Sequence, residues 1–467
     1  MRPLAPRVGA GGALRLRTGR WAERLRAGWR AVSVRAAAVA LVSILACAFT
    51  GASADAGTSS SRASALSATQ SHYLSLALQA LAQAGQSSTW GNQRYRWYNE
   101  LLDDRRPYPL ATIWAVVPLF ETVDYIALAR PTQANLAQVE RFASHAEGYW
   151  DPNITPAPGA LRKTGAYAPY PHSTGDMNTF FDDNGWWSLA FLDAREAMVK
   201  AHRTSLAARY LRDAQRGFLF IYENGWDGRD GGMWWNTTHT IPGGHGRSGE
   251  AIAAATELAA RLYQITGKAL YLQAAVKYIT WANHHLQKGD GSYAASIPDE
   301  MIMPHDGEGA MIAAFTALCQ ARSPVPPAVY AGIPADSYHA NPSVRLPATP
   351  SSWCSWAQAL AFHTAFGIKL GSFTWDRYLP LNDGPQWDAI YLRGLLSLYA
   401  LDHQAQLYDA AAATARRILT RARVPDGLYL RSWNGSATVN GAPFGELRTD
   451  AASVSVLAAL AATRPPS

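Results

Sequence analysis

The sequence predicts an all-α fold of the (α/α)6 toroid class, and three observations support this. Apolar residues recur at helical spacing in many segments, for example at Ala259, Leu262 and Tyr263. Strand-like alternation is scarce. The connections alternate between very short turns, such as 267–268 and 403–404, and loops of 20 residues or more. An α-solenoid is the competing arrangement, but no self-similarity with a period of about 34 or 40 residues is visible.

We expect twelve helices, arranged as six hairpins. In order, they span Ala65–Ala84, Leu110–Ala129, Thr132–Tyr149, Asp182–Ala201, Ser205–Asn224, Ser248–Thr266, Ala269–Leu286, Gly307–Ala321, Ser351–Phe366, Trp387–Asp402, Ala405–Arg423 and Thr449–Thr463. The longest loops precede even-numbered helices, and long loops in a compact domain are usually functional. We therefore expect the even-numbered helices to form an inner ring whose N-termini open into one bowl.

The positive net charge belongs to the N-terminal leader. The chain of 467 residues has a formal charge of +7, but residues 1–35 contain nine arginines and one acidic residue. The rest of the chain therefore carries a charge of −1, and it contains no basic stripe that could follow a phosphate backbone. This pattern argues against nucleic acid as a partner.

The leader has the organisation of an export signal. An uncharged apolar run, Ala36–Phe49, follows the arginines and precedes the small residues at 52–54. We predict a signal peptide at 1–54 that is cut before Asp55, a linker at 55–64, a folded domain at 65–467 and a secreted product. Lipoprotein processing at Cys47 is the alternative. At 14 residues the run is short for a membrane span, and none is expected.

Two cysteines, Cys319 and Cys354, follow the predicted cleavage site. One disulfide and two buried thiols are both compatible with this number in a secreted protein. Neither cysteine lies in a CxxC motif or near a pair of histidines, so the sequence suggests no metal site and no cofactor.

The most informative segment is 178–194, NTFFDDNGWWSLAFLDA. Two consecutive acids, Asp182 and Asp183, open the fourth predicted helix. Acids at a helix start commonly complement the helix dipole and cap free N–H groups. Here, however, aromatic pairs flank the acids on both sides. Retaining glycoside cleavage needs two carboxyls about 5–5.5 Å apart, one as nucleophile and one as acid, and neighbouring residues can meet that distance. Because two such close carboxyls do not ionise together easily, one pKa rises and that group stays protonated.

Further candidates are residues that could contact a sugar. The chain contains 17 tryptophans and 21 tyrosines, which suggests a stacking surface. Adjacent tryptophans on a Gly-rich loop, Trp234 and Trp235, could present a face to a groove or fill the core. Near the eighth helix, Asp306 and Glu308 could contact sugar or cap the helix. The expected substrate-binding residues are Phe181, Asn184, Trp186, Trp187, Trp234, Trp235, Asp306 and Glu308.

The segment FFDDNGWWSLAFLDA resembles the signature of glycoside hydrolase family 76, the bacterial endo-α-1,6-mannanase family. Other stretches resemble the family in the same order, and they lie at 231–236, 258–263, 266–267, 271–272, 386–395 and 450–457. The resemblance spans most of 66–461. It implies an (α/α)6 fold and metal-free retaining hydrolysis of α-1,6-mannosidic bonds, with Asp182 as nucleophile and Asp183 as general acid/base. The stretches 240–250 and 305–309 differ from the family pattern where substrate hydroxyls would be held.

Three functions are compatible with these residues. The first is a secreted retaining α-mannanase that acts on a polysaccharide or oligosaccharide, with α-mannan expected. The second is a transglycosylase that uses the same site and passes the glycosyl unit to another sugar. The third is a non-catalytic glycan-binding protein, and the intact Asp182–Asp183 pair argues against it.

Overall fold

The folded part of the chain is helical, as the sequence predicts. The computed structural model describes residues 65–86, 111–155, 164–171, 178–241, 244–287, 292–297, 306–321, 350–366, 384–425, 427–436, 438–439, 442–443 and 446–467. The chain divides into two units, Met1–Ser64 and Ala65–Ser467. The predicted signal peptide, its Cys47 alternative and the linker lie outside the described residues. Among the residues described, no helix is both long and apolar enough to cross a membrane.

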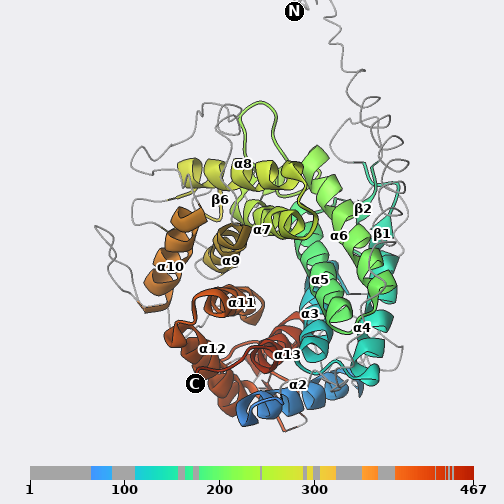
Figure 1. Ribbon diagram of the computed structural model, residues 1–467, viewed down its shortest axis with the longest axis vertical. Coiled ribbons are helices and arrows are strands. Elements are labelled where there is room, and N and C mark those ends of the chain that lie inside the picture. Colours follow the sequence, from blue (N-terminus) through green and yellow to red (C-terminus); the bar gives the residue numbers. More distant parts are fainter. Residues whose placement is uncertain are drawn as a thin grey trace, which may run out of the picture. The chain divides into compact units, whose positions relative to one another are not determined.

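All twelve predicted helices are present in the unit Ala65–Ser467, with their ends displaced by a few residues. Six helices contact one another in a closed ring (Figure 1). These inner helices are α3 (Ile113–Ala129), α5 (Phe181–Lys200), α7 (Gly249–Thr266), α9 (Asp306–Ala321), α11 (Pro385–Asp402) and α13 (Leu447–Ala462). They are the even-numbered helices of the sequence-based order, so the predicted inner ring is confirmed.

Six further helices pack around the outside of this ring (Figure 1). They are α2 (Ala68–Gln86), α4 (Gln133–Ala146), α6 (Thr204–Asn224), α8 (Ala269–His285), α10 (Pro350–Phe366) and α12 (Ala405–Arg417). A 3-10 turn at Glu147–Tyr149 extends α4, and a π-helical turn at Ile418–Ala422 extends α12. The outer helix α6 has one buried face, whereas every residue of α7 from Ala251 to Ala260 is buried.

Short antiparallel strand pairs lie in the connections described. They are β1 (Trp150–Asp151) with β2 (Ala166–Tyr167), β3 (Thr240–Ile241) with β4 (Gly244–His245), β5 (Arg247–Ser248) with β6 (Ser296–Ile297), and β7 (Thr438–Val439) with β8 (Ala442–Pro443). Strand β5 directly precedes α7, and β6 lies between α8 and α9. Within the described residues, each of these sheets has only two strands.

Small residues allow the inner helices to approach closely. A Cβ atom at Gly185 of α5 would lie 2.8 Å from the Cβ of Ala254 in α7. At the crossing of α9 and α11, a Cβ at Gly309 would lie 2.3 Å from the Cα of Tyr391. The first of these contacts is close to the first turns of α5 and α7, and it brings the acidic residues at those helix starts near one another.

A buried charged network links four inner helices. The guanidinium of Arg393 in α11 forms two hydrogen bonds with Glu257 of α7, at 2.7 and 2.8 Å. It also lies 3.8 Å from Glu121 of α3. From α7, Arg261 bonds Asp193 of α5 at 2.5 Å. Because a buried charge without a partner is costly, these bonds tie the helices to one mutual arrangement.

Cys319 and Cys354 form a disulfide that joins α9 to α10, with their Cα atoms 5.0 Å apart. The sequence alone left a bridge and two separate thiols equally open. The structure decides for the bridge.

Candidate active site

Asp182 and Asp183 lie in the first turn of α5, where the sequence placed them. Their exposed fractions are 6% and 9%, so both carboxyls are largely withdrawn from water but retain some accessible surface. The residue before the helix, Phe180, makes no side-chain cap. The positive end of the helix dipole favours negative charge at this position.

The Asp182 carboxylate is held by hydrogen bonds on both of its oxygens. Its Oδ1 accepts from the backbone N–H of Asp183 at 3.0 Å, and its Oδ2 accepts from the indole N–H of Trp235 at 2.8 Å. The side chain of Glu250, the second residue of α7, also hydrogen-bonds Asp182. Burial raises the pKa of Asp182 to about 6, while these hydrogen bonds act in the opposite direction and favour the ionised form.

The Asp183 carboxyl has a different environment. Within the described part of the chain, no hydrogen bond reaches its oxygens, and burial together with the charge of Asp182 raises its pKa well above the usual range for aspartate. The two neighbours therefore differ: hydrogen bonds to Asp182 oppose the effect of burial and limit the rise of its pKa to about 6, whereas among the residues described nothing comparable acts on Asp183, whose surroundings favour the protonated acid. A nucleophile and a general acid need this combination.

The loop that carries Trp235 is paired with the chain that enters α5. The backbone N–H of Phe181 donates to the carbonyl of Trp235 at 2.8 Å, and the N–H of Thr237 donates to the carbonyl of Thr179 at 2.9 Å. The rings of Phe180 and Trp235 meet edge to face, with their centroids 5.1 Å apart. Phe180, Trp235 and Glu250 are only partly buried, so the carboxyl pair borders a side of the fold that water reaches.

The neighbouring Trp234 makes different contacts from those of Trp235. Its indole stacks on the His239 ring, with centroids 4.2 Å apart and planes 6° apart. The guanidinium of Arg247 lies 4.6 Å from the Trp234 ring, and Arg247 is ion-paired with Asp227. Trp234 is therefore fixed by side chains of its own loop, whereas Trp235 is the tryptophan that reaches the carboxyl pair.

Three of the expected sugar contacts are packed into the protein. Phe181, Asn184 and Trp187 have no accessible surface. The ring of Phe181 stacks on Phe220, and the amide of Asn184 bonds both backbone groups of Tyr167, at 2.9 and 3.0 Å. These residues support the site from within, because a sugar could reach them only if the helices separated.

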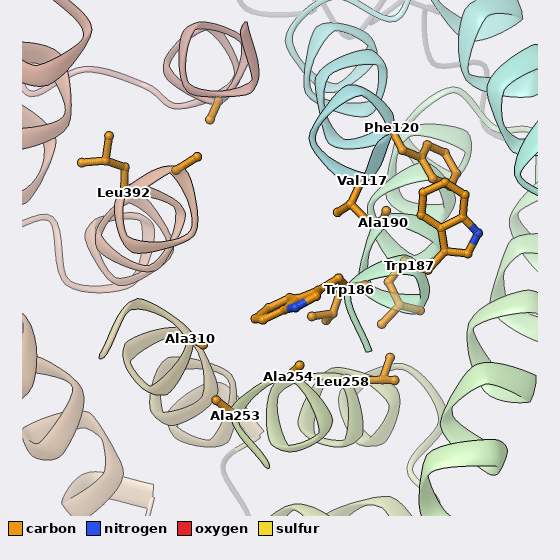
Figure 2. Close-up of a cluster of buried hydrophobic side chains, with 14 of the residues drawn as sticks. Val117, Phe120, Trp186, Trp187, Ala190, Ala253, Ala254, Leu258, Ala310 and Leu392 are labelled. Atoms are coloured by element: carbon orange, nitrogen blue, oxygen red, sulfur yellow. The ribbon is translucent and has the colours of Figure 1, made fainter. Parts of the chain in front are cut away.

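Figure 2 shows how the two tryptophans of α5 differ. The side chain of Trp186 points toward the space between the inner helices, whereas that of Trp187 lies beside Phe120 of α3. The Trp186 ring is 3% exposed, and the guanidinium of Arg393 lies 5.5 Å from its centre. Trp186 follows Asp182 by one helical turn and shares its direction. It is therefore the aromatic side chain of α5 that lies beneath the carboxyl pair.

At the start of α9, Glu308 is 1% exposed and its Oε1 accepts from the backbone N–H of Tyr293 at 3.3 Å. Asp306 is the first residue of α9, and its side chain lies outside the described part of the structure. Glu250 was not among the expected site residues. A signal for it existed, because it opens α7 as the two aspartates open α5, both being inner helices.

Comparison with known proteins finds a family that resembles the segment containing this site. Residues 148–301 match the profile of glycosyl hydrolase family 76, and this segment contains both aspartates, Trp235 and Glu250. Over this segment the chain is similar to glycoside hydrolase family 76. A comparison with curated protein sequences gives no significant match.

Solved structures of family 76 proteins share the fold. A GH76 α-mannanase from Bacteroides thetaiotaomicron matches with a TM-score of 0.62 at 18% identity, over 84% of this chain and 95% of that chain. A family 76 mannosidase of the same organism matches with a TM-score of 0.61 at 16% identity, over 84% and 98%. The GH76A α-1,6-mannanase of Salegentibacter sp. HEL1_6 matches with a TM-score of 0.56 at 14% identity, over 83% and 99%. These likenesses establish the (α/α)6 fold.

The fold alone does not fix the reaction. A cellobiose 2-epimerase from Spirochaeta thermophila matches with a TM-score of 0.50 at 16% identity, over 84% of this chain and 97% of that chain. Related helical rings thus serve different chemistries, and function has to be argued from the site. In this protein the candidate site is the carboxyl pair of α5.

Proposed function

We propose that the protein is a retaining glycosidase that cleaves α-mannosidic bonds, with α-1,6-linked mannan as substrate. The observation that carries this proposal is the unequal environment of two consecutive buried carboxyls, Asp182 with its hydrogen-bond donors and Asp183 without any in the described structure. Support for the substrate comes from the relatives, because a family 76 protein of Salegentibacter was solved with α-1,6-mannotetrose after two consecutive aspartates had been replaced.

The proposed reaction has two steps. In the first, an oxygen of Asp182 bonds to the anomeric carbon of the sugar, the glycosidic bond breaks, and Asp183 gives its proton to the departing oxygen. In the second, Asp183 takes a proton from water, the water oxygen attacks the anomeric carbon, and Asp182 departs as a carboxylate. Two inversions retain the configuration of the sugar, and proton and charge balance over the cycle.

The predicted export signal fits this role. A mannan is a large extracellular polymer, and an enzyme that degrades it has to leave the cytoplasm. We therefore propose that the mature protein is secreted after cleavage before Asp55, with lipid attachment at Cys47 as the alternative. Mass spectrometry of the protein from culture medium and from membranes distinguishes the two.

The test is release of reducing sugar from α-1,6-mannan by the protein and by two variants, Asp182→Asn and Asp183→Asn. We expect each substitution to lower kcat at least about a hundredfold, because each removes a group that acts in the transition state. A matched control is Asp213→Asn, since Asp213 is a buried aspartate of the outer helix α6 whose pKa is also raised to about 6. This control should retain activity.

Product analysis completes the test. Proton NMR at early times should show that the released sugar keeps the α configuration, and added acceptor sugar should not divert the product into longer chains. An inverted product would refute the retaining mechanism, and accumulation of longer oligosaccharides would identify a transglycosylase. Binding of mannan without turnover in the unaltered protein would identify a glycan-binding protein.

A further inference from the structure

The two aspartates are neighbours on one helix, yet the proposed reaction requires them to act differently. Both are buried, and both experience the same helix dipole. Burial and the helix dipole therefore do not decide which of them attacks and which carries the proton, although the backbone N–H of Asp183 gives Asp182 one donor from the same helix. A second donor comes from another part of the fold, and it is the indole N–H of Trp235 at 2.8 Å from Asp182 Oδ2.

The position of Trp235 is set by the backbone. Its carbonyl accepts from the N–H of Phe181, the residue directly before Asp182. On the other side of the loop, the N–H of Ser248 donates to the carbonyl of Met233 at 2.8 Å, and Ser248 caps α7 through its hydroxyl. The loop is thus attached to the starts of both α5 and α7. These attachments fix the backbone at Trp235, and the edge-to-face contact with the ring of Phe180 limits the rotation of the indole.

The loop also closes on itself beyond Trp235. The amide of Asn236 donates to the carbonyl of Thr240 at 3.0 Å, and the N–H of Thr240 donates back to the Asn236 oxygen at 3.0 Å. Before the tryptophan, Gly232 adopts a φ of +82°, and a Cβ there would lie 2.6 Å from the ring of Trp281. A loop with this many fixed contacts holds the donor in place before substrate arrives, which is the condition for effective electrostatic stabilisation.

We propose that Trp235 is a positioning residue that selects Asp182 as the nucleophile, by holding its Oδ2 with the indole N–H and leaving Asp183 without an equivalent donor. This inference rests on the proposed function, and it assigns Trp235 a task other than stacking on sugar. The titratable groups that act on Asp182 are Asp183 of the same helix and Glu250 of α7. Both remain unchanged when the tryptophan is replaced.

The experiment is the substitution Trp235→Phe, which keeps an aromatic ring and removes only the N–H. Carboxyl resonances of ¹³C-labelled aspartate, with Asp182 assigned by its loss in Asp182→Asn, report the titration without any substrate. We expect the pKa of Asp182 to rise by about one pH unit, a tenfold change in the ionised fraction at a given pH. The acidic limb of kcat/KM on α-1,6-mannan should move upward by the same amount, and kcat should fall at least about tenfold.

A matched control is Trp433→Phe, because the buried Trp433 also donates its indole N–H over 2.8 Å, to the hydroxyl of Ser453. This variant should lose stability without any shift of the acidic limb. If Trp235→Phe behaves like the control, Trp235 has only a structural role and the inference is overturned. An unchanged pKa of Asp182 overturns it even where the variant is less active.

A second measurement uses the unaltered fold. The ¹H–¹⁵N resonance of the Trp235 indole should shift with the same midpoint as Asp182, and this titration should vanish in Asp182→Asn. Absence of the shift would overturn the inference even if Trp235→Phe failed to fold. Neither NMR titration needs a substrate. A protein that is inactive on every α-mannoside would refute the proposed function, and the two titrations would still decide the role of the indole.

Discussion

Glu121 allows the link between burial and pH to be tested quantitatively. It lies on α3, it is 9% exposed, and burial raises its pKa from 4.5 to about 7 despite the nearby charge of Arg393. The folded protein therefore holds a proton on Glu121 that the unfolded chain releases near pH 4.5. The stabilisation is fully present below pH 4.5 and is lost as the pH rises to about 7. At 1.36 kcal/mol per pH unit, the loss is about 3 kcal/mol.

The perturbation is Glu121→Gln, which keeps the shape of the side chain and cannot ionise. Denaturant unfolding of both proteins between pH 4.5 and pH 8 gives the difference in their free energies of unfolding. The contributions of groups that titrate alike in both proteins cancel in this difference. Any altered contact between residue 121 and Arg393, 3.8 Å away, adds the same free energy at every pH. We expect the variant to gain about 3 kcal/mol over the native protein across this range. A difference that does not change with pH would refute the reasoning.

Two further predictions concern the packing of the ring and its covalent link. Gly309→Ala should lower the free energy of unfolding by about 1–3 kcal/mol, because its Cβ would lie 2.3 Å from the Cα of Tyr391, whereas Gly307→Ala, whose Cβ would meet nothing within 4 Å, should be neutral or stabilising. Equal effects in denaturant unfolding would contradict this account of the crossing. Replacing both Cys319 and Cys354 by alanine should cost about 3–4 kcal/mol, as expected for a bridge that spans 35 residues. An unchanged unfolding midpoint would show that the bridge does not constrain the unfolded chain.

Local patterns in the sequence were sufficient to predict the helices and the closeness of the two carboxyls of α5. Helix formation depends on residues three and four apart, so all twelve helices and their alternation between inner and outer rings could be predicted from periodicity and loop length. The proximity of Asp182 and Asp183 could also be predicted, because the two residues are consecutive in the chain. The helical repeat also predicts the directions of the side chains on this helix. Trp186 projects from between the two aspartates, while Phe181 and Asn184 project from the opposite side.

The remaining features depend on distances between segments that are far apart in the chain, and only the tertiary structure decided them. The bridge between Cys319 and Cys354 required α9 and α10 to lie side by side. Of two adjacent tryptophans, the sequence could not say that Trp235 bonds Asp182, because 53 residues separate the partners. Part of the difference between the two aspartates arises in the same way: the N–H of Asp183 is a donor from the same helix, but the second donor to Asp182, the indole of Trp235, comes from the loop between α6 and α7.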